Sequence, residues 1–401
     1  DTGSDDESVA VAEGLGAEVY HFDWVEDFAA ARNESIRHAT GEWIFWLDAD
    51  DRLTPRAVAQ IKRAAASGLT DAYCCQVRSR HADGSQDVTE HVRLFRNGLG
   101  IRFAGPIHES VYPDLVRLGL AMARTDIVVE HTGYTSAELV RAKSARNLSI
   151  LDRQLALRPD DLRLLFYRGH ARSNLGDAAG AEADMREYLA RTWPAGSFDH
   201  LRFWAYADLA RALEKSGKEM ELEGVLRRAL QEFPDHPYLL AALGRVLLAA
   251  DRAQQALEKL HAAHDGLCGP VRGFWPPEAW VELGLAECYR AMGRRDQAIS
   301  WAERARAHSP GWDQAAALLA RLHLEAGTVP DDPKIRGLVF LGAGDPLRAA
   351  ESFADAAEAA PSDPGNYRYL AAALQRLGRE AEAMEAWRLA DRWDERGWPA
   401  R

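Results

Sequence analysis

The sequence predicts an α/β domain followed by an all-α solenoid of paired helices. From residue 1 to about 134, short β-like runs alternate with helical stretches, which is the pattern of an α/β domain. From residue 136 to the end the pattern is nearly all helical, and one turn signature recurs in it. We therefore expect two domains, 1–134 and 136–401, with Ser136 as the N-cap of the first helix of the second domain.

The composition is that of a folded protein and excludes several classes. The chain has 401 residues, of which 47% are hydrophobic and 27% charged, with a net charge of −12. Most of the acidic excess lies in residues 1–134, and neither half has the basic patch of a nucleic-acid binder. The apolar runs are short and interrupted by charge, so we expect no membrane span. Four cysteines are too few for a disulfide framework, which favours the cytoplasm.

The second half contains a helix–turn–helix repeat. A glycine is followed five residues later by a small or apolar residue at Gly176/Ala181, Gly217/Leu222, Gly293/Ala298, Gly344/Ala349 and Gly378/Ala383. Asp251 takes the glycine place before Ala256, and several intervals are 34 residues, for example 217 to 251. Proline follows the second helix at Pro159, Pro234, Pro310 and Pro361.

This pattern resembles the tetratricopeptide repeat, with six units, two insertions and a half-repeat. Two antiparallel helices cannot bury their apolar face alone, so such units stack into a superhelix. The resemblance implies a groove that binds a protein or peptide; a rigid spacer or a dimer interface is the alternative, and a homodimer is a further expectation.

The first half is expected to be a layered α/β domain. Helical spacing covers 8–15, 24–38 and 55–66, and β-like runs cover 18–21, 43–47, 72–78, 89–95 and 126–130. Trp43–Leu47 is an unbroken apolar run, which predicts a buried central strand.

Three carboxylates follow that run, at Asp48, Asp50 and Asp51. In open α/β sheets, ligands bind beyond the carboxyl ends of the strands. If strand geometry persists, Asp48 and Asp50 point the same way, and their like charges need a cation or hydrogen-bond donors. Mg²⁺ and Mn²⁺ prefer such oxygen ligands and bridge phosphates, so the sequence predicts a divalent cation here, with a solvated acidic surface as the alternative.

The order of segments resembles a family 2 glycosyltransferase with the Rossmann-like GT-A fold, in the branch that carries tetratricopeptide repeats behind the catalytic domain. The matching segments are Asp1–Asp6, Asp27–Asn33, Gly41–Asp51, Arg93–Arg96, Gly105–Glu109 and His131–Tyr134. By comparison with the family, the first strand, helix and second strand before Asp1 are missing. We interpret the chain as part of a longer protein, with a degenerate domain as the alternative.

The resemblance implies that a nucleotide-sugar, UDP-linked, is the donor. Asp1 would contact the nucleotide base region, although an Asp at this position also caps turns. Arg32 and Asn33 would lie near the nucleotide, and Asp48 would contact the ribose.

The resemblance also implies a metal site for Mn²⁺ or Mg²⁺. Asp50 would ligate the ion that bridges the diphosphate, and Asp51 is the alternative acid. His131 would complete the site, with His108 as its rival.

Glu109 is the candidate base that takes the acceptor proton in an inverting transfer; its alternative is to orient a neighbour by hydrogen bonding. Arg93 and Arg96 are expected to face the donor diphosphate, or to form surface salt bridges.

The sequence therefore predicts a metal-dependent inverting glycosyltransferase, hexosyl- or N-acetylhexosaminyl-specific, that acts on a protein, peptide or glycan. The alternative is a non-catalytic repeat scaffold that binds a protein partner and carries a degenerate transferase domain.

Overall fold

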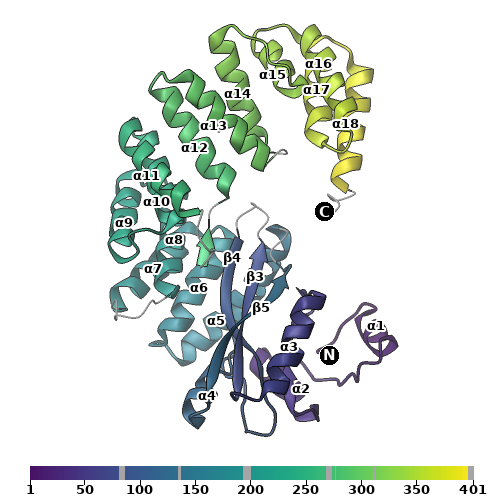
Figure 1. Ribbon diagram of the computed structural model, residues 1–401, viewed down its shortest axis with the longest axis vertical. Coiled ribbons are helices and arrows are strands. Elements are labelled where there is room, and N and C mark those ends of the chain that lie inside the picture. Colours follow the sequence, from purple (N-terminus) through teal and green to yellow (C-terminus); the bar gives the residue numbers. More distant parts are fainter. Residues whose placement is uncertain are drawn as a thin grey trace. The chain divides into compact units, whose positions relative to one another are not determined.

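The computed structural model describes residues 1–80, 86–133, 137–192, 200–267, 273–275, 277–309 and 312–395. A mixed sheet near the N-terminus is followed by a long run of helices, which confirms the predicted combination of an α/β fold and an all-α fold (Figure 1). The chain forms two compact units, one of residues 1–234 with 270–275 and one of residues 235–269 with 276–401. The domain boundary between 134 and 136 stays a prediction.

The sheet of the first unit has the strand order β1-β4-β3-β5-β2, and β6 pairs with β4. The strands are β1 (Trp43–Phe45), β2 (Asp51–Arg52), β3 (Ala72–Arg80), β4 (Gln86–Arg96), β5 (Met122–His131) and β6 (Gly273–Trp275). The β3–β5 pair is parallel and the other pairs are antiparallel. In the β2–β5 pair, Asp51 lies opposite His131.

Helices cover both faces of this sheet. Helices α2 (Phe28–His38) and α4 (Tyr112–Leu118) pack on one face, in a core that includes Cys74 of β3. Helix α3 (Pro55–Ser67) packs on the other face, in a core that includes Cys75 of β3. Neighbouring residues of one strand therefore serve opposite cores, as the period of two requires. A short helix, α1 (Ser8–Gly14), precedes these elements.

Three expectations for this region are wrong. Residues 18–21 form no strand; over the described chain their backbone pairing is one bond, from Asp1 N to Tyr20 O, and the neighbouring Phe22 N donates to Asp1 O. Helix α2 begins only at Phe28, because the side chain of Asp27 caps it by accepting from Ala30 N. Strand β1 is short, half-buried and at one end of the strand order rather than central.

The remaining helices fall into the two units. The first unit holds α5 (Ala137–Leu157), α6 (Leu162–Leu175), α7 (Ala178–Arg191), α8 (His200–Lys215) and α9 (Glu219–Glu232). The second unit holds α10 (Pro237–Ala249), α11 (Ala253–Leu267), α12 (Glu278–Ala291), α13 (Arg295–His308), α14 (Asp313–Ala326), α15 (Pro333–Gly342), α16 (Pro346–Ala359), α17 (Pro364–Arg376) and α18 (Glu380–Glu395). Over the described residues, none of the helices combines the length and the apolar character that crossing a membrane demands. Ser136 and Pro310 lie outside the described residues.

The turn signature marks the bend between paired helices. All six turn residues have a positive φ: Gly176, Gly217, Asp251, Gly293, Gly344 and Gly378. The residues five positions later are all buried at helix crossings: Ala181, Leu222, Ala256, Ala298, Ala349 and Ala383. Gly327 makes the same turn between α14 and α15, which accounts for the half-repeat. The repeat thus combines a left-handed turn with a close helix contact.

The positive φ of the turn residue Asp251 indicates that a glycine there would stabilise the fold. Its φ is 58°, a region that costs a residue with a Cβ atom on the order of 1 kcal/mol relative to glycine. Asp251→Gly should therefore raise the free energy of unfolding by up to about 1 kcal/mol, measured by urea denaturation followed by circular dichroism. The reverse change at an equivalent turn, Gly293→Ala, should lower it; a destabilised Asp251→Gly would contradict this account.

Candidate functional site

A turn after β1 gathers the three aspartates. Asp51 N donates to Asp48 O at 3.0 Å, and Asp48 N donates to Asp51 Oδ2 at 2.8 Å. Strand geometry ends at Phe45, so the expected strand alternation does not align Asp48 and Asp50. The turn brings their carboxylates together instead.

Pairing between β2 and β5 adds an imidazole to the aspartates. His131 Nδ1 lies 2.9 Å from Asp51 Oδ1 and 3.6 Å from Asp50 Oδ1. One ligand atom from each of Asp48, Asp50, Asp51 and His131 lies within 4.8 Å of the others. Three carboxylates and an imidazole are a donor set that suits Mn²⁺ or Mg²⁺, so the residues present fit the expected ion.

Asp51 is the buried support of this cluster. Its side chain is 0% exposed, and Oδ2 accepts from Arg93 Nη1 at 2.8 Å. Arg93 is itself buried, with its guanidinium 3.7 Å from the centre of the Trp46 ring. Burial alone would raise the pKa of Asp51, but bonds from His131 and Asp48 N and the charge of Arg93 outweigh it and lower the pKa. Asp51 therefore stays ionised and orients the His131 ring.

Asp50 is held by a residue from beyond the sheet. Lys143 of α5 donates from Nζ to Asp50 Oδ2 at 2.7 Å. Burial would raise the pKa of Asp50, but the bond from Lys143 and the charge of His131 outweigh it and lower the pKa. Thr132 N donates to Asp50 O at 2.9 Å, which fixes the backbone of this residue beside β5.

Arg32 of α2 joins the aspartate cluster to Glu109, the candidate base. Its guanidinium forms ion pairs with both Asp48 and Glu109. It also lies over the rings of Trp46 and Phe103, at 4.3 Å and 5.5 Å from their centres. The side chain of Glu109 is only 10% exposed, so Arg32 supplies a charge partner where water is scarce.

Other predicted residues lie in different surroundings. The side-chain amide of Asn33 forms two hydrogen bonds with the backbone of Phe103. Asn33 Oδ1 accepts from Phe103 N at 2.8 Å, and Asn33 Nδ2 donates to Phe103 O at 2.9 Å. His108 has a φ of 51° and stacks on Tyr167 of α6, with 3.7 Å between ring centres. Arg96 lies over the Trp43 ring rather than beside the aspartates.

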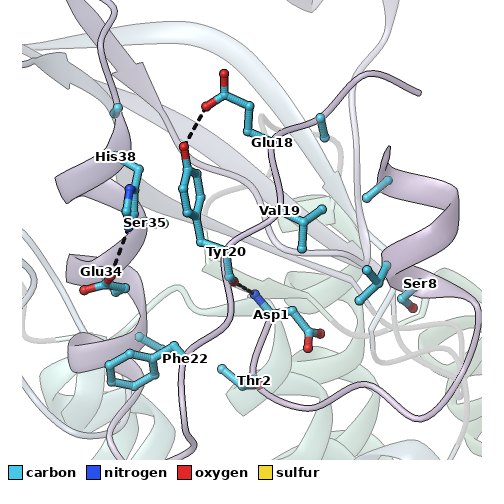
Figure 2. A pocket seen from close by; sticks show the side chains of 15 residues that line it. Asp1, Thr2, Ser8, Glu18, Val19, Tyr20, Phe22, Glu34, Ser35 and His38 are labelled. Atoms are coloured by element: carbon cyan, nitrogen blue, oxygen red, sulfur yellow. Dashed lines mark hydrogen bonds and ion pairs between the residues drawn. The ribbon is translucent and has the colours of Figure 1, made fainter. Parts of the chain in front are cut away.

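Asp1 lines a separate cavity of about 470 Å³ between α1 and α2. Its carboxylate accepts from Gly3 N at 2.9 Å and from the Ser4 hydroxyl, so it caps the turn as an Asp at this place commonly does. Figure 2 shows Tyr20 and His38 in the wall of this cavity, where their rings stack at 3.6 Å between centres.

A second group with metal-ligand chemistry lies in the second unit, at His264, Glu278 and Glu282. Glu282 is fully buried, and Arg304 Nε donates to it at 3.1 Å while His308 Nδ1 lies 2.7 Å from it. Arg304 and His308 balance the buried carboxylate of Glu282, so we interpret the group as an ion-pair network that joins α11, α12 and α13.

Sequence reasoning missed two features of the site. Lys143 belongs to none of the sequence motifs of the site, and a single lysine on a helix does not by itself indicate a functional residue. Asp51 was expected as a substitute for Asp50, yet its burial makes it the support of His131. The sequence holds no local signal for that difference, since Asp51 stands between Asp50 and Arg52.

Comparison with protein families matches two parts of the chain. The model for glycosyl transferase family 2 matches residues 1–128, and a tetratricopeptide-repeat model matches residues 269–322.

Two curated proteins are similar to longer stretches. A TPR repeat-containing protein of Synechococcus elongatus is 31% identical over 277 residues, which are 64% of this chain and 67% of that protein. The SPbeta prophage-derived glycosyltransferase SunS of Bacillus subtilis is 28% identical over 160 residues, which are 38% of this chain and 36% of SunS. The chain therefore spans about a third of the length of SunS.

Solved structures of repeat proteins are similar to part of the chain. A thermophilic TPR protein of Thermus thermophilus covers 47% of this chain and 100% of its own, with 19% identity and a TM-score of 0.34. Yeast Tom70 covers 64% of this chain and 48% of its own, with 17% identity and a TM-score of 0.38.

We expect a large loss of stability when the Arg93 side chain is replaced, because this breaks its buried ion pair with Asp51. Arg93→Met leaves a fully buried carboxylate without its cation, and we expect a loss of about 3 kcal/mol in the free energy of unfolding, measured by urea denaturation. The matched control is Arg78→Met, which removes the exposed pair with Glu130 and should cost under about 1 kcal/mol. Equal losses for the two variants would show that burial does not set the strength of the Asp51 pair.

Proposed function

Because the chain belongs to glycosyltransferase family 2, in a branch that carries tetratricopeptide repeats, we propose that it is a metal-dependent inverting glycosyltransferase. It transfers a hexosyl or N-acetylhexosaminyl group from a UDP-linked sugar to a protein, peptide or glycan. The observation that carries this proposal is the meeting of Asp48, Asp50, Asp51 and His131 within 4.8 Å, with Arg32 pairing both Asp48 and Glu109.

In this proposal the cation is held by Asp50 and His131. Asp51 binds His131 at Nδ1, which leaves Nε2 as the ring nitrogen that would ligate the ion, as is typical of metal-binding histidines. Asp48 lies within reach of the same centre and is proposed to contact the ribose. When bound, the ion stabilises the negative charge that develops on the departing diphosphate.

Glu109 is proposed to take the proton of the acceptor as the nucleophile attacks the anomeric carbon. Its ion pair with Arg32 fixes the position of the carboxylate that would accept this proton. Arg32 also contacts Asp48, so one guanidinium sets the spacing between the donor side and the base. Asn33 supports this spacing by holding the backbone of Phe103, whose ring lies under Arg32.

The nucleotide base is proposed to lie in the cavity beside Asp1, where the exposed edge of Tyr20 offers an aromatic surface. The repeats are proposed to bind the protein or peptide acceptor, as stacked helix pairs form extended grooves. Buried free thiols at Cys74, Cys75 and Cys288 support a reducing compartment, the cytoplasm.

Two substitutions separate donor binding from transfer. Asp50→Asn should lower Mn²⁺-dependent turnover of a UDP-sugar at least about 100-fold, because the ion loses a charged ligand. Glu109→Gln should keep UDP affinity within about threefold and lose transfer by a factor of about 10² or more, because an amide accepts no proton. The measurements are UDP release with a panel of UDP-sugars and UDP binding by calorimetry.

Asp126→Asn is the matched control, since Asp126 is an exposed carboxylate of β5 that bonds to Gln60. It should behave as the wild type. Full turnover in Asp50→Asn would remove Asp50 from the metal site, and a wild-type transfer rate in Glu109→Gln would eliminate Glu109 as the base.

A further inference from the structure

The first helix after the sheet, α5, places a cation at the candidate metal site. Lys143 Nζ lies 2.7 Å from Asp50 Oδ2, although the two residues are 93 positions apart. This contact belongs to the first unit, yet its lysine comes from the helical part of the sequence. The all-α region therefore contributes a charged side chain to the site of the α/β region.

The backbone at Gly133 shows how closely this lysine approaches the candidate ligands. A Cβ atom added there would lie no more than 2.7 Å from each of three atoms, namely Asp50 Oδ2, Lys143 Nζ and His131 Nε2. Three polar atoms from three parts of the chain thus meet over one glycine. The ammonium therefore lies beside both residues that are proposed to hold the ion.

Lys143 is also the most exposed of the three cations that balance the aspartates. Its side chain is 35% exposed, against 21% for Arg32 and 3% for Arg93. Arg32 and Arg93 are further fixed by the aromatic rings beneath them. Lys143 is therefore the cation with the most access to solvent, which makes it the one most able to exchange partners.

We propose that Lys143 is the exchangeable counter-ion of Asp50. In the metal-free protein its ammonium neutralises Asp50 and holds the carboxylate in position. An ammonium at 2.7 Å and a divalent ion at about 2.0–2.1 Å cannot share Oδ2 without strong repulsion, so Lys143 releases this oxygen when the ion is loaded. In this proposal its new partner is the diphosphate of the donor, since a point charge on a flexible stem can turn toward a phosphate.

This inference rests on the metal site proposed above, and it adds a mode of regulation to it. Lys143 weakens metal binding in the absence of donor and strengthens donor binding once the metal is present. By linkage, each of these ligands then promotes the binding of the other. Lys143 acts in this way as a positioning residue that couples loading of the ion to loading of the donor.

The test measures binding of Mn²⁺ alone and of UDP at saturating Mn²⁺, on the full chain at constant ionic strength. Free Mn²⁺ is followed by electron paramagnetic resonance, and UDP binding by calorimetry. Lys143→Met should bind Mn²⁺ about fivefold more tightly and UDP about fivefold more weakly than the wild type. Lys143→Arg keeps the charge and should restore both constants to within about twofold of the wild type.

Arg141→Met is the matched control, because Arg141 is exposed on the same helix and its loss changes the net charge equally. Both constants should stay within about twofold of the wild type. A structural role of Lys143 alone would lower the thermal midpoint and leave both constants unchanged. Lys143→Gln carries the same test if Lys143→Met does not fold.

The outcomes separate the two proposals. Unchanged Mn²⁺ affinity in Lys143→Met, or the same change in Arg141→Met, overturns the role of Lys143 and leaves the metal site standing. No Mn²⁺ or Mg²⁺ binding at millimolar concentration in any variant overturns the metal site and the counter-ion together.

Discussion

The buried ion pair between Arg93 and Asp51 is the interaction on which the candidate site depends. Asp51 accepts from Arg93 and from the backbone of Asp48, and its other oxygen holds His131. A carboxylate with no exposed surface has to be matched in this way, because an unpaired charge there would be very costly. Since Asp51 is used for support, Asp48 and Asp50 keep part of their surface for ligands. The run of three acids thus contains one buried supporting residue, Asp51, and two partly exposed residues, Asp48 and Asp50.

Sheet topology explains why the Arg93–Asp51 pair controls the position of the turn that carries Asp48 and Asp50. Strands β1 and β2 lie at opposite ends of the strand order, and residues 46–50 join them. Along the way Trp46 N donates to Arg93 O of β4, and Thr132 next to β5 donates to Asp50 O. The connection is therefore anchored on two other strands. A change in the Arg93–Asp51 contact would move the turn that carries Asp48 and Asp50 and would move the His131 ring.

Local patterns predicted the repeats well because the turn residue and the buried residue that define each repeat lie within a few positions of each other. A positive φ at Asp251 was foreseeable, since this residue stands where the other units have glycine. The buried alanines five positions later follow from the same spacing. Predictions that depended on distant partners were weaker: residues 18–21 look like a strand but lack the ladder that defines one, and β1 is apolar without being central. Apolar sequence indicates burial, whereas position in a sheet depends on which strands pair.

The residues themselves determined the two fold types, the left-handed turns and the acidic run after β1, because these depend on neighbours within a few positions. Only the tertiary structure decided how the acids divide their roles. Asp51 became the support because Arg93 and His131 reach it from two different strands. Lys143 joined the site because α5 brings its ammonium to Asp50 across 93 residues, and no local pattern records so distant a contact. Electrostatic partners within a site are set by distance in space, and it is the packing of the helices on the sheet that establishes those distances.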